Sequence, residues 1–127
     1  MPSNTKQVVN WFEIPTTNID RAAAFYSKVF QRELKHELFN GTPHAIFRSE
    51  DPMTSGTLIQ DGNLKPGRTG TRIYLHAADG VAPLLERVVA NGGKVVLAAM
   101  SIGPQGTIGI LEDLDGNQVG VHTPGEH

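Results

Sequence analysis

The stretch WFEIPTTNIDRAAAFYSKVF, residues 11–30, decides the fold of the N-terminal half of this 127-residue chain. It continues a hydrophobic run that predicts a strand over residues 8–14, and Pro15 ends that strand because proline has no N–H group for a ladder. Asn18 or Asp20 can then cap a helix, in which alanine and aromatic residues recur with amphipathic helical spacing. The stretch therefore predicts one strand followed directly by one helix.

The remainder of the first half predicts three further strands. Asn40-Gly41 is a strong signal for a tight hairpin turn, because both residue types tolerate a positive φ. Apolar and β-branched residues around this turn and beyond it predict strands over residues 34–39, 44–48 and 57–60. The order of elements in the first half is therefore βαβββ.

The same order returns after a polar segment, rich in glycine and proline, that begins at Asp61. The second half predicts a strand over residues 71–77, a helix over 81–90, and strands over 94–98, 107–112 and 118–123. Asn91-Gly92-Gly93 ends this second helix with a left-handed cap. Two βαβββ units at a spacing of about sixty residues indicate an internal duplication.

The composition of the chain excludes several classes of protein. Hydrophobic residues make up 39 %, which is enough for a packed core, and the net charge of −2 is scattered along the sequence. We therefore expect no nucleic-acid partner and no anionic membrane partner. The absence of cysteine excludes a thiolate metal site and a cysteine nucleophile. With neither a signal-peptide pattern nor an apolar run of about 20 residues, we expect a soluble, cytoplasmic protein.

Three motifs resemble the vicinal oxygen chelate superfamily, which contains glyoxalase I, bleomycin-resistance proteins and extradiol dioxygenases. They are Asp20-Arg21-Ala22 with Phe25-Tyr26 and Val29-Phe30 in the first helix, Gly92-Gly93-Lys94-Val95 after the second, and Leu111-Glu112-Asp113-Leu114-Asp115-Gly116-Asn117 before the last strand. In the third motif, Leu114 replaces the proline that is usual in the superfamily. Together the motifs extend over nearly the whole chain.

This resemblance implies an α+β fold in which two βαβββ modules form a curved mixed sheet around a cleft, with the helices outside. A single domain would fill residues 1–127, with the first module over about 7–61, a linker over 62–69 and the second module over about 70–124. The resemblance also implies a homodimer and a small-molecule ligand. It does not name the activity, because the fold hosts unrelated functions.

The superfamily's metal enzymes carry His, Gln or Glu at fixed inward positions of their strands. Aligned on the motifs, three of these positions fall at Trp11, Arg72 and Gly120. Tryptophan has no lone pair for a metal, arginine is a fixed cation and glycine has no side chain. We therefore expect no metal and no other cofactor at the usual site, which argues against an ordinary glyoxalase I or extradiol dioxygenase.

Strand alternation places other polar residues one step along from these positions. Glu13 follows Trp11 on the same side of its strand, Tyr74 and His76 follow Arg72, and His122 follows Gly120. We assign candidate catalytic roles to Glu13, His76 and His122, and substrate binding to Trp11, Arg72, Tyr74 and Gly120. Glu13 would then lie within a strand because its side of the strand faces the cleft.

Several interpretations of this polar cluster stay open at the level of sequence. Glu13 can pair with Arg72 or a histidine and stabilise a polar groove without any chemistry. It can instead act with His76 or His122 as a general base in a metal-free lyase or isomerase, with Arg72 holding an anionic substrate. A displaced divalent metal site at Glu13, His76 and His122 is a third reading. Finally, the protein can be a non-catalytic module that binds or sequesters a small molecule, as drug-resistance proteins do.

Overall fold

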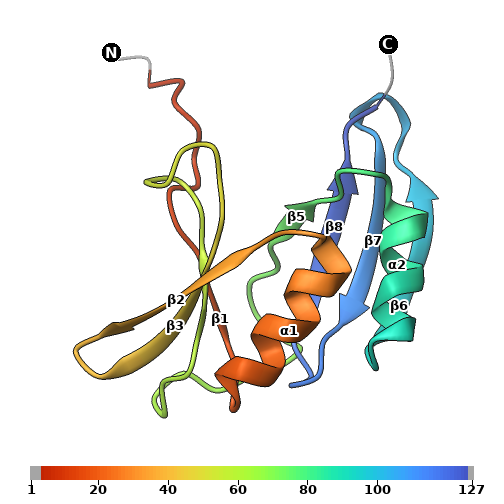
Figure 1. Cartoon of the computed structure of the whole chain (residues 1–127). Coiled ribbons are helices and arrows are strands. Elements are labelled where there is room, and N and C mark those ends of the chain that lie inside the picture. The colour runs from red at the N-terminus through yellow and green to blue at the C-terminus, as the bar shows by residue number, and fades with distance from the viewer. Residues whose placement is uncertain (1–3, 126–127) are drawn as a thin grey trace.

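The computed structural model describes residues 4–125, so residues 1–3 and 126–127 of the expected domain lie outside it. Within this range two helices and eight strands follow one another in the order βαβββ–βαβββ (Figure 1). The elements are β1 (Glu13–Pro15), α1 (Ile19–Phe30), β2 (Leu34–Phe39), β3 (Thr42–Phe47), β4 (Thr57–Ile59), β5 (Tyr74–His76), α2 (Val81–Ala90), β6 (Lys94–Ser101), a 3₁₀ turn (Gly103–Gln105), β7 (Thr107–Glu112) and β8 (Gln118–Thr123). Neither helix has the length and apolar character that crossing a membrane requires.

Each repeat forms its own four-stranded sheet, and the two sheets have equivalent strand orders. The first runs β1-β4-β3-β2 and the second β5-β8-β7-β6. In each sheet the first strand of the repeat lies parallel to the last, while the other neighbouring strands are antiparallel. This equivalence confirms the duplication and the α+β fold that the sequence predicts.

The predicted turn and cap residues are found where the sequence placed them. Asn40 and Gly41 have φ values of 51° and 80° and connect β2 to β3. The Asn18 side chain accepts a hydrogen bond of 3.1 Å from the backbone N–H of Arg21 and thereby caps α1. After α2, Gly92 has a φ of 93°, which ends the helix in the left-handed region.

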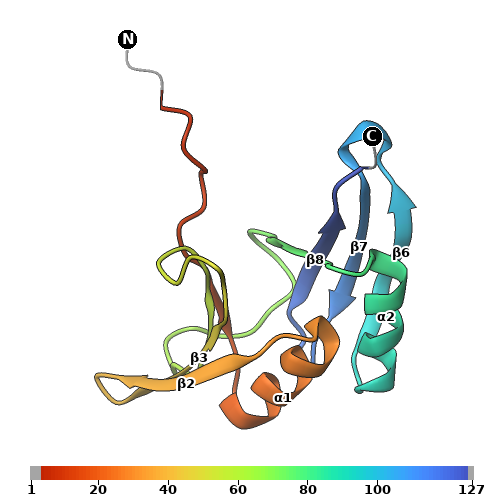
Figure 2. The ribbon, with the colours of Figure 1, turned by 45° about the horizontal axis from the view of Figure 1, so that its top comes forward.

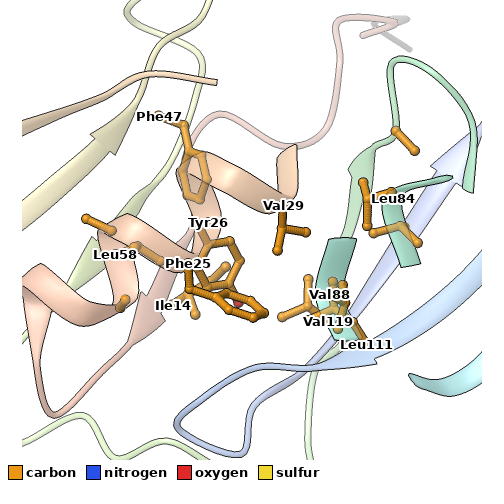
Figure 3. Close-up of a cluster of buried hydrophobic side chains, with 14 of the residues drawn as sticks. Ile14, Phe25, Tyr26, Val29, Phe47, Leu58, Leu84, Val88, Leu111 and Val119 are labelled. Carbon is orange, nitrogen blue, oxygen red and sulfur yellow. The ribbon is translucent and has the colours of Figure 1, made fainter. Parts of the chain in front are cut away.

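One hydrophobic core lies between the two repeats, and both helices contribute to it (Figure 3). Val29 of α1 and Val88 of α2 are fully buried in it, as are Leu58 of β4 and Leu111 of β7. Burying a side chain of this size stabilises the fold by about 1.5–3 kcal/mol. Because the core is shared between the repeats, residues on the other face of each sheet point away from it.

The first strand is shorter than the sequence predicts, and this part of the prediction is wrong. The expected strand over residues 8–14 is reduced to β1, and the preceding segment extends away from the body (Figure 2). Val8 is 97 % exposed, so hydrophobicity alone does not hold this segment against the fold. Pro15 belongs to β1 instead of ending it, because it occupies the last position of an edge strand and its missing N–H disrupts no bond.

The fifth strand is also shorter than the predicted range 71–77. β5 comprises three residues, and Ile73 before it still accepts a hydrogen bond of 2.8 Å from the N–H of Gly120. Arg72 therefore precedes the strand, as Trp11 precedes β1. Gly70, with a φ of 91°, redirects the chain just before this point. Two of the predicted ligand-binding residues thus stand at the entrances of strands and not within them.

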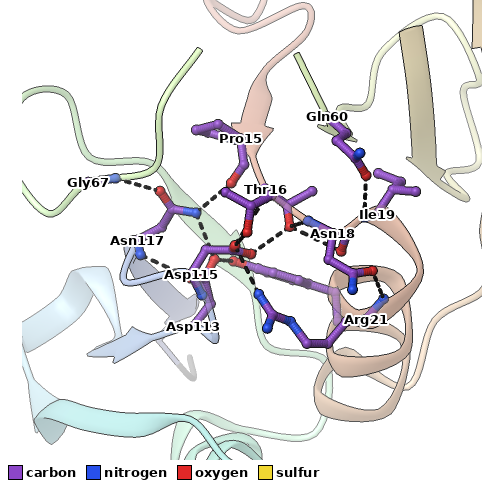
Figure 4. Close-up of polar contacts among 12 residues, drawn as sticks. Pro15, Thr16, Asn18, Ile19, Arg21, Gln60, Gly67, Asp113, Asp115 and Asn117 are labelled. Atoms are coloured by element: carbon purple, nitrogen blue, oxygen red, sulfur yellow. Dashed lines mark hydrogen bonds and ion pairs between the residues drawn. The ribbon is translucent and has the colours of Figure 1, made fainter. Parts of the chain in front are cut away.

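A network of polar contacts joins the turn between β7 and β8 to the start of the first repeat (Figure 4). Asp115 accepts hydrogen bonds from the hydroxyl groups of Thr16, at 2.6 Å, and Thr17, at 2.9 Å. Asn117 donates a bond of 2.8 Å to the carbonyl of Pro15. The turn is thereby tied to the segment between β1 and α1, and it fixes one repeat against the other.

Candidate functional site

The candidate site lies on the face of β5 and β8 that points away from the core. These strands are parallel, with Tyr74 opposite Gly120 and His76 opposite His122. Leu75 and Val121, which lie between these two pairs along their strands, point to the opposite face, and Val121 is fully buried. Because side chains alternate along a strand, the two pairs share one open face. Four of the seven predicted site residues therefore lie together in two adjacent rows.

Tyr74 lies directly over Gly120. A Cβ atom added at Gly120 would stand 2.3 Å from the Tyr74 ring, closer than any side chain tolerates. The glycine therefore lets the aromatic ring lie down on the sheet, while the residue remains 43 % exposed. We call this exposed ring above Gly120 the Tyr74 platform. A flat aromatic surface of this kind offers stacking to a planar ligand.

His122 is held in one orientation by the turn before β7. Its Nε2 atom lies 2.7 Å from the backbone carbonyl oxygen of Gln105. A carbonyl can only accept, so Nε2 carries the proton of this hydrogen bond. In the neutral ring Nδ1 then has the lone pair, and this nitrogen is the one that can act as a base. The turn thus selects the tautomer of His122.

Arg72 stands beside the Tyr74 platform. Its Nη2 atom makes a hydrogen bond of 3.4 Å to Oε1 of Gln118, the residue two positions before Gly120 on the same face of β8. This bond is long and weak, and Arg72 is exposed. Within residues 4–125 no carboxylate forms an ion pair with it. The guanidinium group is therefore available to an anionic or carbonyl oxygen.

Glu13 lies apart from the two histidines. It lines a hollow of about 190 Å³ together with Lys65, Thr71 and Gln118, whereas His76 lines a different cavity. β1 and β5 are edge strands of separate sheets, so strand alternation alone does not bring their side chains together. Gln118 is the link between the Glu13 hollow and the platform, because it also contacts Arg72.

The residues at the superfamily's metal positions do not fit a metal ion. Trp11 is 41 % exposed before β1, Arg72 is a cation and Gly120 is covered by the Tyr74 ring. The displaced site is not assembled either, since no three His, Asp or Glu side chains among residues 4–125 are arranged to hold a metal.

The sequence did not reveal that Asp113, in the turn between β7 and β8, and Tyr26, in α1, form a buried pair of titratable groups with shifted pKa values. The Tyr26 hydroxyl donates a bond of 2.7 Å to Asp113, and both residues are buried. Burial raises the pKa of Asp113, and hydrogen bonds from neighbouring donors oppose this only in part. Burial also raises the pKa of Tyr26 well above its ordinary value, and the charge of Asp113 adds to the shift. These groups hold the repeats together and do not line the open face.

Comparisons of the sequence with known proteins identify the family of this chain. The family model described as "Glyoxalase/Bleomycin resistance protein/Dioxygenase superfamily" matches residues 8–121. A "Glyoxylase-like domain-containing protein" of Didymella fabae is 28 % identical over 125 residues, which cover 93 % of this chain and 95 % of that protein.

Solved structures share the fold at low sequence identity. The fosfomycin resistance protein FosX of Listeria monocytogenes has a TM-score of 0.69 at 15 % identity, covering 96 % of this chain and 93 % of its own. A glyoxalase-related enzyme of Fulvimarina pelagi has a TM-score of 0.68 at 20 % identity, with 92 % and 88 % covered. A mutant of glyoxalase I from Zea mays has a TM-score of 0.71 at 17 % identity, covering 93 % of this chain and 45 % of that one. By its family model and its fold, this chain belongs to the Glyoxalase/Bleomycin resistance protein/Dioxygenase superfamily.

Proposed function

We propose that this protein binds a small planar molecule that carries a carbonyl or anionic oxygen. The ligand stacks on the Tyr74 platform and its oxygen faces Arg72, with the two histidines at the other end of the platform. The observation that carries this proposal is the exposed ring of Tyr74 lying over Gly120, with a histidine pair in the next row of the same face.

Physical chemistry supports a ligand at this position. A planar ligand that covers the exposed ring removes its apolar face from water. Stacking of this kind contributes about 0.5–1.5 kcal/mol of binding free energy beyond the area buried. The neighbouring guanidinium has no carboxylate partner within residues 4–125, so an anionic oxygen gains a charge-assisted hydrogen bond. Both contributions come from Tyr74 and Arg72, whose side chains are exposed on this face and therefore accessible to a ligand.

A catalytic version of this function is favoured by one specific contact. The bond from His122 to Gln105 fixes the ring and leaves Nδ1 as the basic nitrogen. A positioned imidazole with a free lone pair is a common general base for moving a proton next to a carbonyl. In that case the protein is a metal-independent lyase or isomerase in which His122 takes the proton and Arg72 orients the substrate. His76, one row away, would stabilise developing charge.

The experiment that tests the binding function uses Gly120→Ala. A library of planar carboxylates and carbonyl compounds is screened by ¹H–¹⁵N correlation spectra for ligands that shift the amide signals of β5 and β8 in wild type. The added methyl group displaces the Tyr74 ring, so these ligands should no longer bind Gly120→Ala. Gly62→Ala is the matched control, because Gly62 has open space where the methyl group would lie. Ligands that bind wild type and Gly120→Ala equally well would contradict the proposal. Proton exchange at the ligand that disappears in His122→Gln distinguishes catalysis from binding.

A further inference from the structure

A second cavity lies at the C-terminal end of α1. It has a volume of about 250 Å³, and its apolar walls are Phe12, Phe30, Phe47 and Leu75. Its polar wall carries Arg32 and His76, and the two remaining lining residues are serines. The first repeat supplies six of the eight lining residues and β5 of the second supplies the other two. The cavity therefore spans the junction between the repeats.

The aromatic walls of this cavity are fixed in place. A Cβ atom at Gly56 would stand 2.2 Å from the Phe12 ring, so the ring packs directly on the glycine backbone. Phe12 contacts Phe47 with ring centroids 5.6 Å apart, and Phe47 meets Tyr26 edge-on at 5.7 Å. Tyr26 in turn stacks on Phe30 at 5.8 Å with an interplanar angle of 7°. Continuous contact of this kind makes a rigid, preformed aromatic wall against which a flat ring can pack.

Arg32 supplies the positive charge of the cavity. Gln31, which has a φ of 52°, ends α1 and redirects the chain, and the backbone N–H of Arg32 returns to the carbonyl of Ser27. The guanidinium group is anchored through Nη1, which donates to the carbonyl of Arg48. Within residues 4–125 no carboxylate pairs with Arg32. A half-buried cation without a counterion favours an anionic ligand.

We propose that this cavity binds a small aromatic carboxylate. The ring of the ligand lies against the wall that Phe12 and Phe47 form together, and its carboxylate meets Arg32, with His76 at the opposite edge. No acidic side chain among residues 4–125 lines the cavity, so no carboxylate in the described wall repels the anion. Drug-sized ligands occupy pockets of roughly 300–1,000 Å³, and the smaller space here selects a single ring. This site is separate from the Tyr74 platform, and His76 is the residue nearest to both.

The test is a titration of the full chain with benzoate, followed by ¹H–¹⁵N correlation spectra, with benzamide as the uncharged ligand of the same shape. Benzoate should shift the amides around Phe12, Arg32 and Phe47 with an affinity at least tenfold higher than benzamide. Arg32→Met should weaken benzoate roughly tenfold to a hundredfold, the value of one charge-assisted hydrogen bond, and leave benzamide unchanged. Arg48→Met is the matched control, because this exposed arginine pairs with Glu33 and does not line the cavity.

The absence of localised shifts at millimolar benzoate would overturn the proposal. So would equal affinities of wild type for benzoate and benzamide, or equal weakening of benzoate binding by Arg32→Met and Arg48→Met. The comparison of benzoate with benzamide on wild type needs no variant, so it decides the question even if Arg32→Met does not fold. Tyr74→Ala should leave benzoate binding unchanged. If that variant abolishes benzoate binding, the ligand occupies the platform instead.

Discussion

Tyr26 and Asp113, which are 87 residues apart in the sequence, are joined by a buried hydrogen bond of 2.7 Å across the interface of the two repeats. Asp113 also accepts bonds of 2.9 Å from the backbone N–H groups of Asp115 and Asn117, so it organises its own turn as well. The same turn holds Thr16 through Asp115. One short segment therefore determines how the repeats are placed, and with them the open face and the cavity.

Removing the hydroxyl group of Tyr26 tests this relationship. Tyr26→Phe leaves a buried carboxylate with one donor fewer, which costs about 1–3 kcal/mol in the free energy of unfolding. Urea denaturation followed by circular dichroism measures the change. Tyr74→Phe is the control, because Tyr74 is exposed and its hydroxyl makes no hydrogen bond within residues 4–125. Equal stability of Tyr26→Phe and wild type would show that the bond contributes nothing to the interface.

The stabilising contribution of Asp115 to folding should be lost in acid. Burial acts to raise the pKa of Asp115, but hydrogen bonds from Thr16 and Thr17 outweigh it and lower the pKa below the ordinary value of 3.8. A lowered folded-state pKa stabilises the protein above pH 3.8, and this contribution is lost as the pH falls through the folded pKa. The stability difference between wild type and Asp115→Asn should therefore be largest near neutral pH and shrink below pH 3.8.

Asp113 provides an internal contrast for that measurement. Its pKa is raised by burial, so its contribution is fully present below pH 3.8 and is lost as the pH rises through the higher folded value. Relative to Asp113→Asn, wild type should lose stability with rising pH, which is the opposite trend. Free energies of unfolding from urea titrations at several pH values measure both trends. The same trend in both variants would contradict the assigned directions.

The sequence predicted those elements that strong local signals define. β2, α2, β7 and β8 have the predicted boundaries, because Asn40-Gly41, the Gly92 cap and the turn around Gly116 fix their ends. The first strand was overestimated, since its apolar residues before Phe12 have no neighbouring strand to pair with in the part of the chain that the structure describes. A hydrophobic pattern shows that a segment needs a partner, but it does not show whether the same chain supplies one.

The candidate site was predictable to the same degree. The period of two in a strand is enough to place Tyr74, His76, Gly120 and His122 on one face. The separation of Glu13 from these residues depends on how the two sheets are placed, which no local pattern encodes. The Tyr26–Asp113 contact was missed for the same reason, although the sequence contained the turn motif as a marker of the family.

Arg72→Met should weaken ligand binding at the Tyr74 platform without affecting folding. Arg72 is exposed, and the hydrogen bond of its side chain to Gln118 is 3.4 Å long, so removal of the guanidinium group leaves the melting temperature nearly unchanged. Loss of a charge-assisted hydrogen bond costs about 1.5–3 kcal/mol of binding free energy. Isothermal titration calorimetry with an anionic hit from the library measures it. If Arg72→Met instead lowers the melting temperature strongly, and no ligand stabilises wild type, the polar residues of this face serve the stability of the fold and not ligand binding.

Elemental analysis after mild purification should find less than one equivalent of any divalent metal per chain. Trp11, Arg72 and Gly120 offer no ligand atoms at the positions that bind metal in the superfamily's metal enzymes. The displaced site provides the decisive comparison. One equivalent of zinc, nickel or iron that is lost on Glu13→Ala would overturn this prediction and would bring Glu13 and the histidines together in a conformation different from the one described.

The segment before β1 predicts association of two copies of this chain. Val8 and Val9 are 97 % and 53 % exposed, and the outer edge of β1 has no neighbouring strand among residues 4–125. If a second copy covers this segment, the dimer is stabilised because the exposed apolar side chains are buried and the open edge of β1 is paired. Sedimentation at micromolar concentration should therefore give twice the chain mass of 13.7 kDa. Substituting both valines by serine should shift the protein toward the monomer, whereas Val89→Ser, at an exposed position on α2, should not. Val89 lines a hollow between α2 and β6 together with Leu85 and Val95. If Val89→Ser alone dissociates the dimer, the copies meet at this hollow instead; a wild type that stays monomeric would remove the prediction altogether.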